Sequence, residues 1–90
     1  MDWPAAERRI RGGENLHTEF KREIGHPDDL AAELVAFANT DGGQIYVGVA
    51  DDGDITGITK PDELARYVDN IAYNNCEPPI SVLQEVVYSP

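Results

Sequence analysis

The sequence lacks the residues that build several common kinds of protein site. It has 90 residues and a single cysteine, Cys76, which excludes an internal disulfide and any zinc site with paired cysteines. A chain without disulfides is typical of a reducing compartment, so we expect a cytoplasmic protein. No apolar run reaches the length of a signal-peptide core or a membrane span, and we therefore expect no membrane partner.

Four catalytic sequence motifs are also missing. The chain contains no GxxxxGK[ST] or GxGxxG loop, which excludes nucleotide hydrolysis by the P-loop route and the usual dinucleotide fingerprint. It has neither a GxSxG nucleophile elbow nor an HExxH zinc motif. The usual hydrolase and protease classes are therefore not indicated.

Positive charge is scarce. Seven basic residues stand against 17 acidic ones, which gives a formal net charge of −10. Such a chain repels a phosphate backbone, so any contact with nucleic acid has to be local. The acidity has two interpretations: adaptation to high salt, where the repulsion is screened, or an ordinary acidic domain whose partner is a protein or a metal ion.

The residues that are present predict one α+β domain over residues 1–90, with helices packed on a mixed β-sheet. We expect helices at 4–10, 27–39 and 61–74, a strand at 16–22, a hairpin of strands 44–49 and 55–58, and a last strand at 80–88. Because the chain ends directly after that last strand, we expect a domain truncated at its C-terminus. Gly42 and Gly43, in the turn before residue 44, are predicted to supply a positive φ or to let another backbone approach closely, and a side chain at Gly43 should be destabilising if φ there is positive.

Two clusters of basic residues are candidate phosphate contacts. Arg8, Arg9 and Arg11 form the first, and Lys21 with Arg22 forms the second. Clustered arginines can make bidentate contacts with phosphate even on an acidic domain. The alternative is a helix face whose positive charges balance nearby acids.

Glu14, Glu19 and Asp51 are candidate catalytic and metal-binding residues. Carboxylates that meet at one sheet edge can hold Mg²⁺ or Mn²⁺ for phosphodiester cleavage. Each also has a structural interpretation: Glu14 as a solvated loop charge, Glu19 as a partner of Lys21 or an arginine, and Asp51 as a turn former.

Three segments in order along the chain resemble the Schlafen AlbA-like domain family. They are Gly13–Lys21 (GENLHTEFK), Ala36–Val49 (AFANTDGGQIYVGV) and Asp52–Ile58 (DGDITGI). The resemblance spans roughly residues 7 to 80. It implies a DNA- or RNA-binding domain of the kind found in bacterial and archaeal transcription regulators, which needs no cofactor.

The resemblance also implies an alternative, a Schlafen-type ribonuclease that depends on Mg²⁺ or Mn²⁺. Two of the family's acids fall on Glu14 and Glu19, whereas the third position falls on Ala50, one residue before Asp51. A one-residue bulge would be needed to bring Asp51 into place. Because animal Schlafen proteins form their cleft from two lobes, a homodimer is expected. A third possibility is a protein-interaction or dimerisation module.

Overall fold

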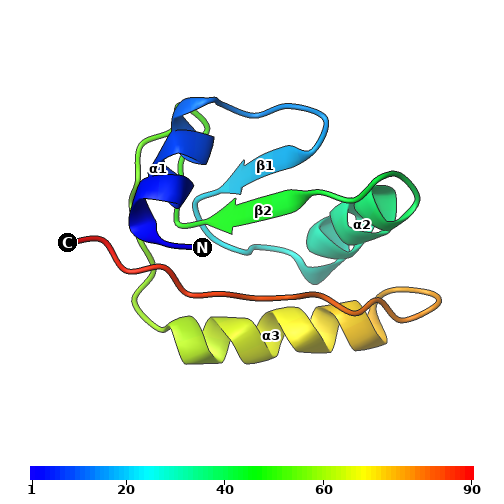
Figure 1. The fold of residues 1–90 in the computed structure, drawn as a ribbon. Helices are drawn as coiled ribbons and strands as arrows, with labels where there is room; N and C mark the ends of the chain where they lie inside the picture. The colour runs from blue at the N-terminus through cyan, green and yellow to red at the C-terminus, as the bar shows by residue number, and fades with distance from the viewer.

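The computed structural model describes residues 1–90 as three helices and a two-stranded parallel sheet, which confirms the predicted α+β class (Figure 1). The elements are α1 (Trp3–Arg11), β1 (Thr18–Lys21), α2 (Pro27–Ala38), β2 (Gln44–Val47) and α3 (Pro61–Asn74). No helix is both long and apolar enough to cross a membrane.

Each helix begins where the sequence places a helix-start signal. The Asp2 side chain caps α1 by accepting a hydrogen bond of 3.0 Å from the Ala5 amide. The ring of His26 caps α2 in the same way, through the Asp28 amide. All three helices have proline in the first turn, where its missing N–H costs nothing.

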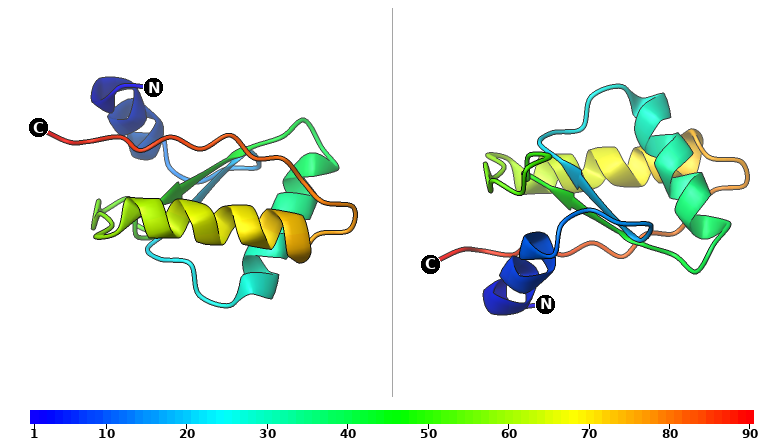
Figure 2. Two further views of the ribbon diagram at one scale, coloured as in Figure 1. Left: turned by 90° about the horizontal axis from the view of Figure 1, so that it is seen from below. Right: turned by 90° about the horizontal axis from the view of Figure 1, so that it is seen from above.

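The two strands are parallel, with Phe20 beside Tyr46 and Lys21 beside Val47. Parallel neighbours require a crossover connection, and α2 supplies it. Side chains alternate between the two faces of the strands, so Phe20 and Lys21 point to opposite sides. Figure 2 shows α1 on one side of the sheet and α2 with α3 on the other.

The hydrophobic core is divided by the sheet. On the α2 and α3 side, a cluster of six buried residues forms: Leu30, Ala31, Leu34, Ile71, Ala72 and Cys76. On the α1 side, Ile10, Phe20 and Val49 form a smaller cluster, with Tyr46 packed against it. Both faces of this short sheet are therefore covered, as is usual for parallel strands.

Two of the predicted strands do not form. Residues 55–58 contribute only an isolated antiparallel bridge between Val49 and Ile55. Residues 80–88 are outside any strand, and Ile80, whose amide bonds to the Ala72 carbonyl, makes their only backbone–backbone hydrogen bond. The segment pairs with neither free edge of the two-stranded sheet, and the Gln84 side chain bonds instead to α3.

The first strand is also shorter than predicted. It begins at Thr18 because the residues before it turn back, with Asn15 and Thr18 bridged through their backbones. The Asn15 side chain stabilises this turn by accepting a hydrogen bond from the His17 amide.

The two glycines after α2 are needed for different reasons, Gly42 for its backbone conformation and Gly43 for space. The positive φ belongs to Gly42, at 90°, and not to Gly43. Gly43 is required for space, since a Cβ there would lie 2.5 Å from the Phe37 ring. The condition of a positive φ is therefore met at Gly42 and not at Gly43, where the close approach of the Phe37 side chain makes a Cβ costly.

Candidate nucleic-acid interface

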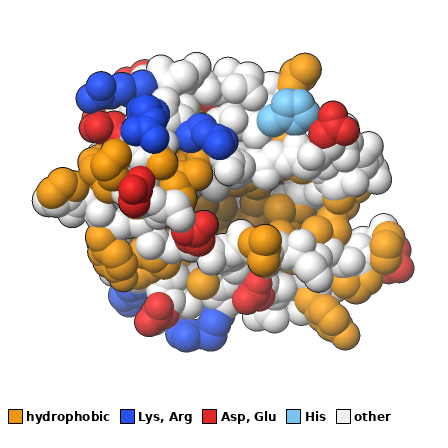
Figure 3. All heavy atoms as spheres, in the orientation of Figure 1, with side chains coloured by type: hydrophobic (Ala, Val, Ile, Leu, Met, Phe, Trp, Pro, Cys, Tyr) orange, Lys and Arg blue, Asp and Glu red, His pale blue; other side chains and the backbone are white.

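The three arginines of the first cluster lie together on α1. Ala6 and Ile10 are the buried residues of this helix, and Arg8, Arg9 and Arg11 are all exposed in its last turn. Positive side chains are favoured there because the helix dipole is negative at its C-terminus. Figure 3 shows blue Lys and Arg side chains gathered over the region of α1.

Arg9 is positioned by β2, through two residues that sequence reasoning missed. Its Nη1 donates to the Gln44 Oε1 at 2.9 Å, and the Tyr46 hydroxyl donates to the same oxygen at 2.7 Å. Burial raises the pKa of Tyr46, while the nearby Arg9 opposes that rise. The only sequence signal for this contact is that residues 44 and 46 share one strand face.

The other two arginines of α1 are less constrained. Arg11 pairs with Glu7 one turn earlier at 3.4 Å, and its side chain remains 76% exposed. Arg8 makes no ion pair. The guanidinium groups of Arg8 and Arg11 can therefore reach an external phosphate at little cost.

The second basic cluster is divided by the sheet. Lys21 points to the α2 side, where its Nζ lies 2.6 Å from the Glu33 Oε1, and the two side chains are only 19% and 27% exposed. Arg22 is exposed and lines a shallow hollow with Ala50, Asp51 and Asp52. The structure therefore does not join Lys21 to the arginines of α1.

Two of the three predicted catalytic acids influence each other. The Glu14 Oε2 accepts a hydrogen bond of 3.0 Å from the Phe20 amide, which ties the loop before β1 to that strand. Partial burial raises the pKa of Glu19, the charges of Glu14 and Glu33 raise it further, and Lys21 opposes them. Glu33 was not among the residues predicted from the sequence.

The third acid does not complete a metal site. Asp51 is exposed in the turn after β2. No group of three His, Cys, Asp or Glu side chains in the structure could hold a metal ion. Asp51 therefore does not join Glu14 and Glu19 in a three-carboxylate cluster.

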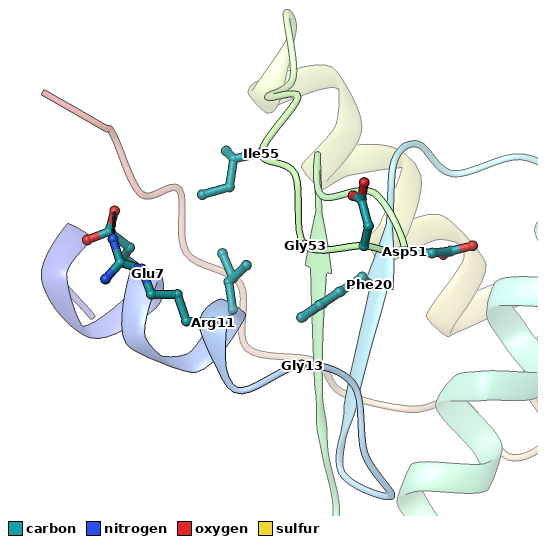
Figure 4. A pocket seen from close by; sticks show the side chains of 9 residues that line it. Glu7, Arg11, Gly13, Phe20, Asp51, Gly53 and Ile55 are labelled. Atoms are coloured by element: carbon teal, nitrogen blue, oxygen red, sulfur yellow. Dashed lines mark ion pairs between the residues drawn. The ribbon is translucent and has the colours of Figure 1, made fainter.

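An open cavity of about 360 Å³ separates α1 from the turn after β2. Its apolar walls are Ile10, Phe20 and Ile55, and Glu7, Arg11, Asp51 and Asp52 supply charges of both signs (Figure 4). Figure 4 shows the Asp51 side chain pointing away from the space between Ile55 and Phe20. Because Ile10 and Phe20 are only 6% and 3% exposed, the cavity offers little surface on which a base could stack.

Comparison with known proteins identifies the family of the chain. The family described as Schlafen, AlbA_2 matches residues 14–89. No curated protein and no solved structure gives a significant match. The matched region starts after α1 and does not include Arg8, Arg9 and Arg11. A role for these arginines is therefore argued from their own charge and exposure and not from the family match. Because the match covers far more than half of the sequence, the chain belongs to the Schlafen AlbA_2 family.

Proposed function

We propose that this domain binds DNA or RNA as part of a transcription regulator, with α1 as its main phosphate-contacting element. Membership of the Schlafen AlbA_2 family suggests nucleic-acid binding. The observation that carries the proposal is the exposed cluster of Arg8, Arg9 and Arg11 on a chain with a net charge of −10. A concentration of positive charge on one helix offsets the general repulsion at that place alone.

The contacts of these arginines support the proposal in different ways. Arg9 is held by Gln44, so less side-chain entropy is lost when its remaining N–H groups bind a phosphate. Arg8 has no ion pair to break. Arg22 can add a peripheral contact, although Asp51 and Asp52 lie beside it. Lys21 contributes least, because Glu33 already neutralises it.

A metal-dependent ribonuclease is the alternative, with Glu14, Glu19 and Asp51 as its acids. The proximity of Glu14 and Glu19 favours it, since like charges that raise a pKa are relieved when a cation binds. The absence of a three-residue metal site counts against it. A protein-interaction module without nucleic-acid contacts is the third candidate.

Fluorescence anisotropy with labelled single-stranded RNA, stem-loop RNA and duplex DNA tests the binding proposal. The double variant Arg8→Gln/Arg11→Gln should bind about tenfold more weakly or worse, because hydrogen bonds to charged groups contribute about 1.5–3 kcal/mol each. Its dependence on salt should also become shallower, since fewer counterions are released. Arg66→Gln, at an exposed position of α3, is the single-charge control and should bind like the wild type.

The same samples, incubated with Mn²⁺ and run on a denaturing gel, separate the three candidates. Binding without cleavage supports the binding module. Cleavage that requires Mn²⁺ and is lost in Glu19→Gln would replace it with the ribonuclease. No binding to any of the three ligands at low salt, where phosphate contacts are strongest, would favour the protein-interaction module.

A further inference from the structure

The segment after α3 has the sequence of a strand and no strand partner. Residues 80–88 read ISVLQEVVY, which is rich in β-branched and aromatic residues. Figure 1 shows this segment extended alongside α3. No backbone–backbone hydrogen bond involves residues 81–90. Their N–H and C=O groups therefore remain available to another strand.

The same segment exposes large apolar side chains. Leu83, Val86 and Tyr88 are 104%, 43% and 76% exposed, whereas Ile80 and Val82 pack against the larger core cluster. The segment is thus held to the domain by Ile80, Val82 and the side chains of Gln84 and Glu85, whereas Leu83, Val86 and Tyr88 are open to solvent. Exposed apolar side chains on an unpaired extended backbone are typical of a strand that pairs with another chain.

The distribution of charge indicates which partner fits. Between residues 78 and 90 the only charged side chain is that of Glu85, and the N-terminal amino group pairs with it. The remainder of the chain carries a large excess of acid. Two copies of a protein with a net charge of −10 repel each other least when they meet through this nearly neutral segment.

We propose that residues 81–88 pair with the same segment of a second copy, as antiparallel strands related by a twofold axis. A twofold interface uses the same surface on both copies, and antiparallel pairing of identical segments satisfies that symmetry. The pairing gives the free backbone groups hydrogen-bond partners and places apolar side chains of the two copies next to each other, with Leu83 on one face of the paired strands and Val86 and Tyr88 on the other. It involves none of the arginines of α1 and does not depend on nucleic-acid binding.

Charge also sets the sign of the salt dependence of this dimer. Salt shortens the screening length from about 10 Å at 0.1 M to about 3 Å at 1 M, which reduces the repulsion between the two acidic bodies. Dimerisation should therefore strengthen as salt is added. Phosphate contacts weaken under the same conditions, so the two kinds of association are separable by salt alone.

Sedimentation velocity of the 90-residue chain from about 0.05 to about 1 M NaCl tests the proposal. The wild type should form a dimer whose dissociation constant falls with salt. Leu83→Asp should raise that constant by about tenfold or more, because it adds two charges to a paired apolar surface. Leu16→Asp is the matched control, since Leu16 is 88% exposed in the loop before β1, and it should dimerise like the wild type.

Amide hydrogen exchange gives a second measurement that does not depend on a variant. Amides of residues 81–88 should become protected as protein concentration rises at high salt, while those of α3 stay unchanged. A wild type that is monomeric at all salt concentrations would overturn the proposal. Equal effects of Leu83→Asp and Leu16→Asp on the dissociation constant would overturn it as well. So would amide protection of residues 81–88 that does not change with protein concentration.

Discussion

The surroundings of Glu19 differ from what its sequence neighbours indicate. Lys21, two residues further along the chain, was one expected partner in the structural interpretation, and an arginine was the other. In the structure Lys21 lies 2.6 Å from Glu33 instead, and Glu14 and Glu33 add negative charge around Glu19. Its pKa is raised above the ordinary value, so the folded protein holds this proton more tightly than the unfolded chain does.

Replacing Glu19 with Gln should stabilise the protein near neutral pH. A raised carboxyl pKa means that ionised Glu19 costs stability as pH rises through the folded pKa, and Gln avoids that cost. The melting temperature should increase by about 1–3 °C near pH 7, a small gain because the group is partly exposed. The gain should vanish below the ordinary pKa of 4.5, where Glu19 is protonated in both states.

Thermal unfolding followed by circular dichroism over this pH range measures the effect. Glu23→Gln, which removes one acid at an exposed loop position, is the control and should change the melting temperature less. A lower melting temperature for Glu19→Gln near pH 7 would contradict the charge environment described for Glu19.

At the level of elements, the Lys21–Glu33 pair joins β1 to α2. Both side chains are mostly buried, and the Glu33 Oε2 has no hydrogen-bond partner. A half-buried charge pair contributes little net stability, yet loss of one partner leaves the other charge uncompensated. The pair therefore specifies how α2 sits on the strand more than it stabilises the fold.

Lys21→Met should lower the free energy of unfolding by about 1–3 kcal/mol, because it leaves the Glu33 carboxylate without a partner. The double variant Lys21→Met/Glu33→Met should recover most of that loss, since neither charge remains to be compensated. Urea unfolding of the wild type, both single variants and the double variant gives the coupling energy. Additive single effects would show that the two side chains do not interact.

Over the whole molecule, excess negative charge opposes both folding and association. With 17 acidic and seven basic residues, the compact state concentrates repulsion that the unfolded chain spreads out. The arginines of α1 and the nearly neutral segment 78–90 are the two surfaces that depart from this pattern. They are also the surfaces for which we propose nucleic-acid binding and self-association.

The melting temperature should therefore rise with NaCl. Screening of the self-repulsion between about 0.05 and 1 M is expected to add roughly 3–10 °C, since about 1 kcal/mol corresponds to about 4–8 °C in a domain of this size. Differential scanning calorimetry at several salt concentrations and low protein concentration measures this without a contribution from dimers. A flat or falling melting temperature would exclude charge repulsion as the main effect and remove support for adaptation to high salt.

Local signals in the sequence determined the elements that form. Proline in the first turn of every helix, joined by acids in α2 and α3, marked the helix starts. Alternation of apolar residues predicted the strand that became β1, and a β-branched run predicted the one that became β2. The breaker cluster at residues 39–43 correctly ended α2, and the three family motifs agree with the family match. These features depend on residues a few positions apart, so the sequence alone carries them.

Only the tertiary structure decided which side chains meet. Gln44 lies 35 residues after Arg9 in the sequence, and Glu33 lies in α2 whereas Lys21 lies in β1. No local sequence pattern connects the two residues of either pair. Residues 80–88 have strand propensity as well, yet the fold does not pair them with either free edge of the sheet. A strand becomes part of a sheet, and an acid becomes part of a site, only when packing brings a distant partner to it.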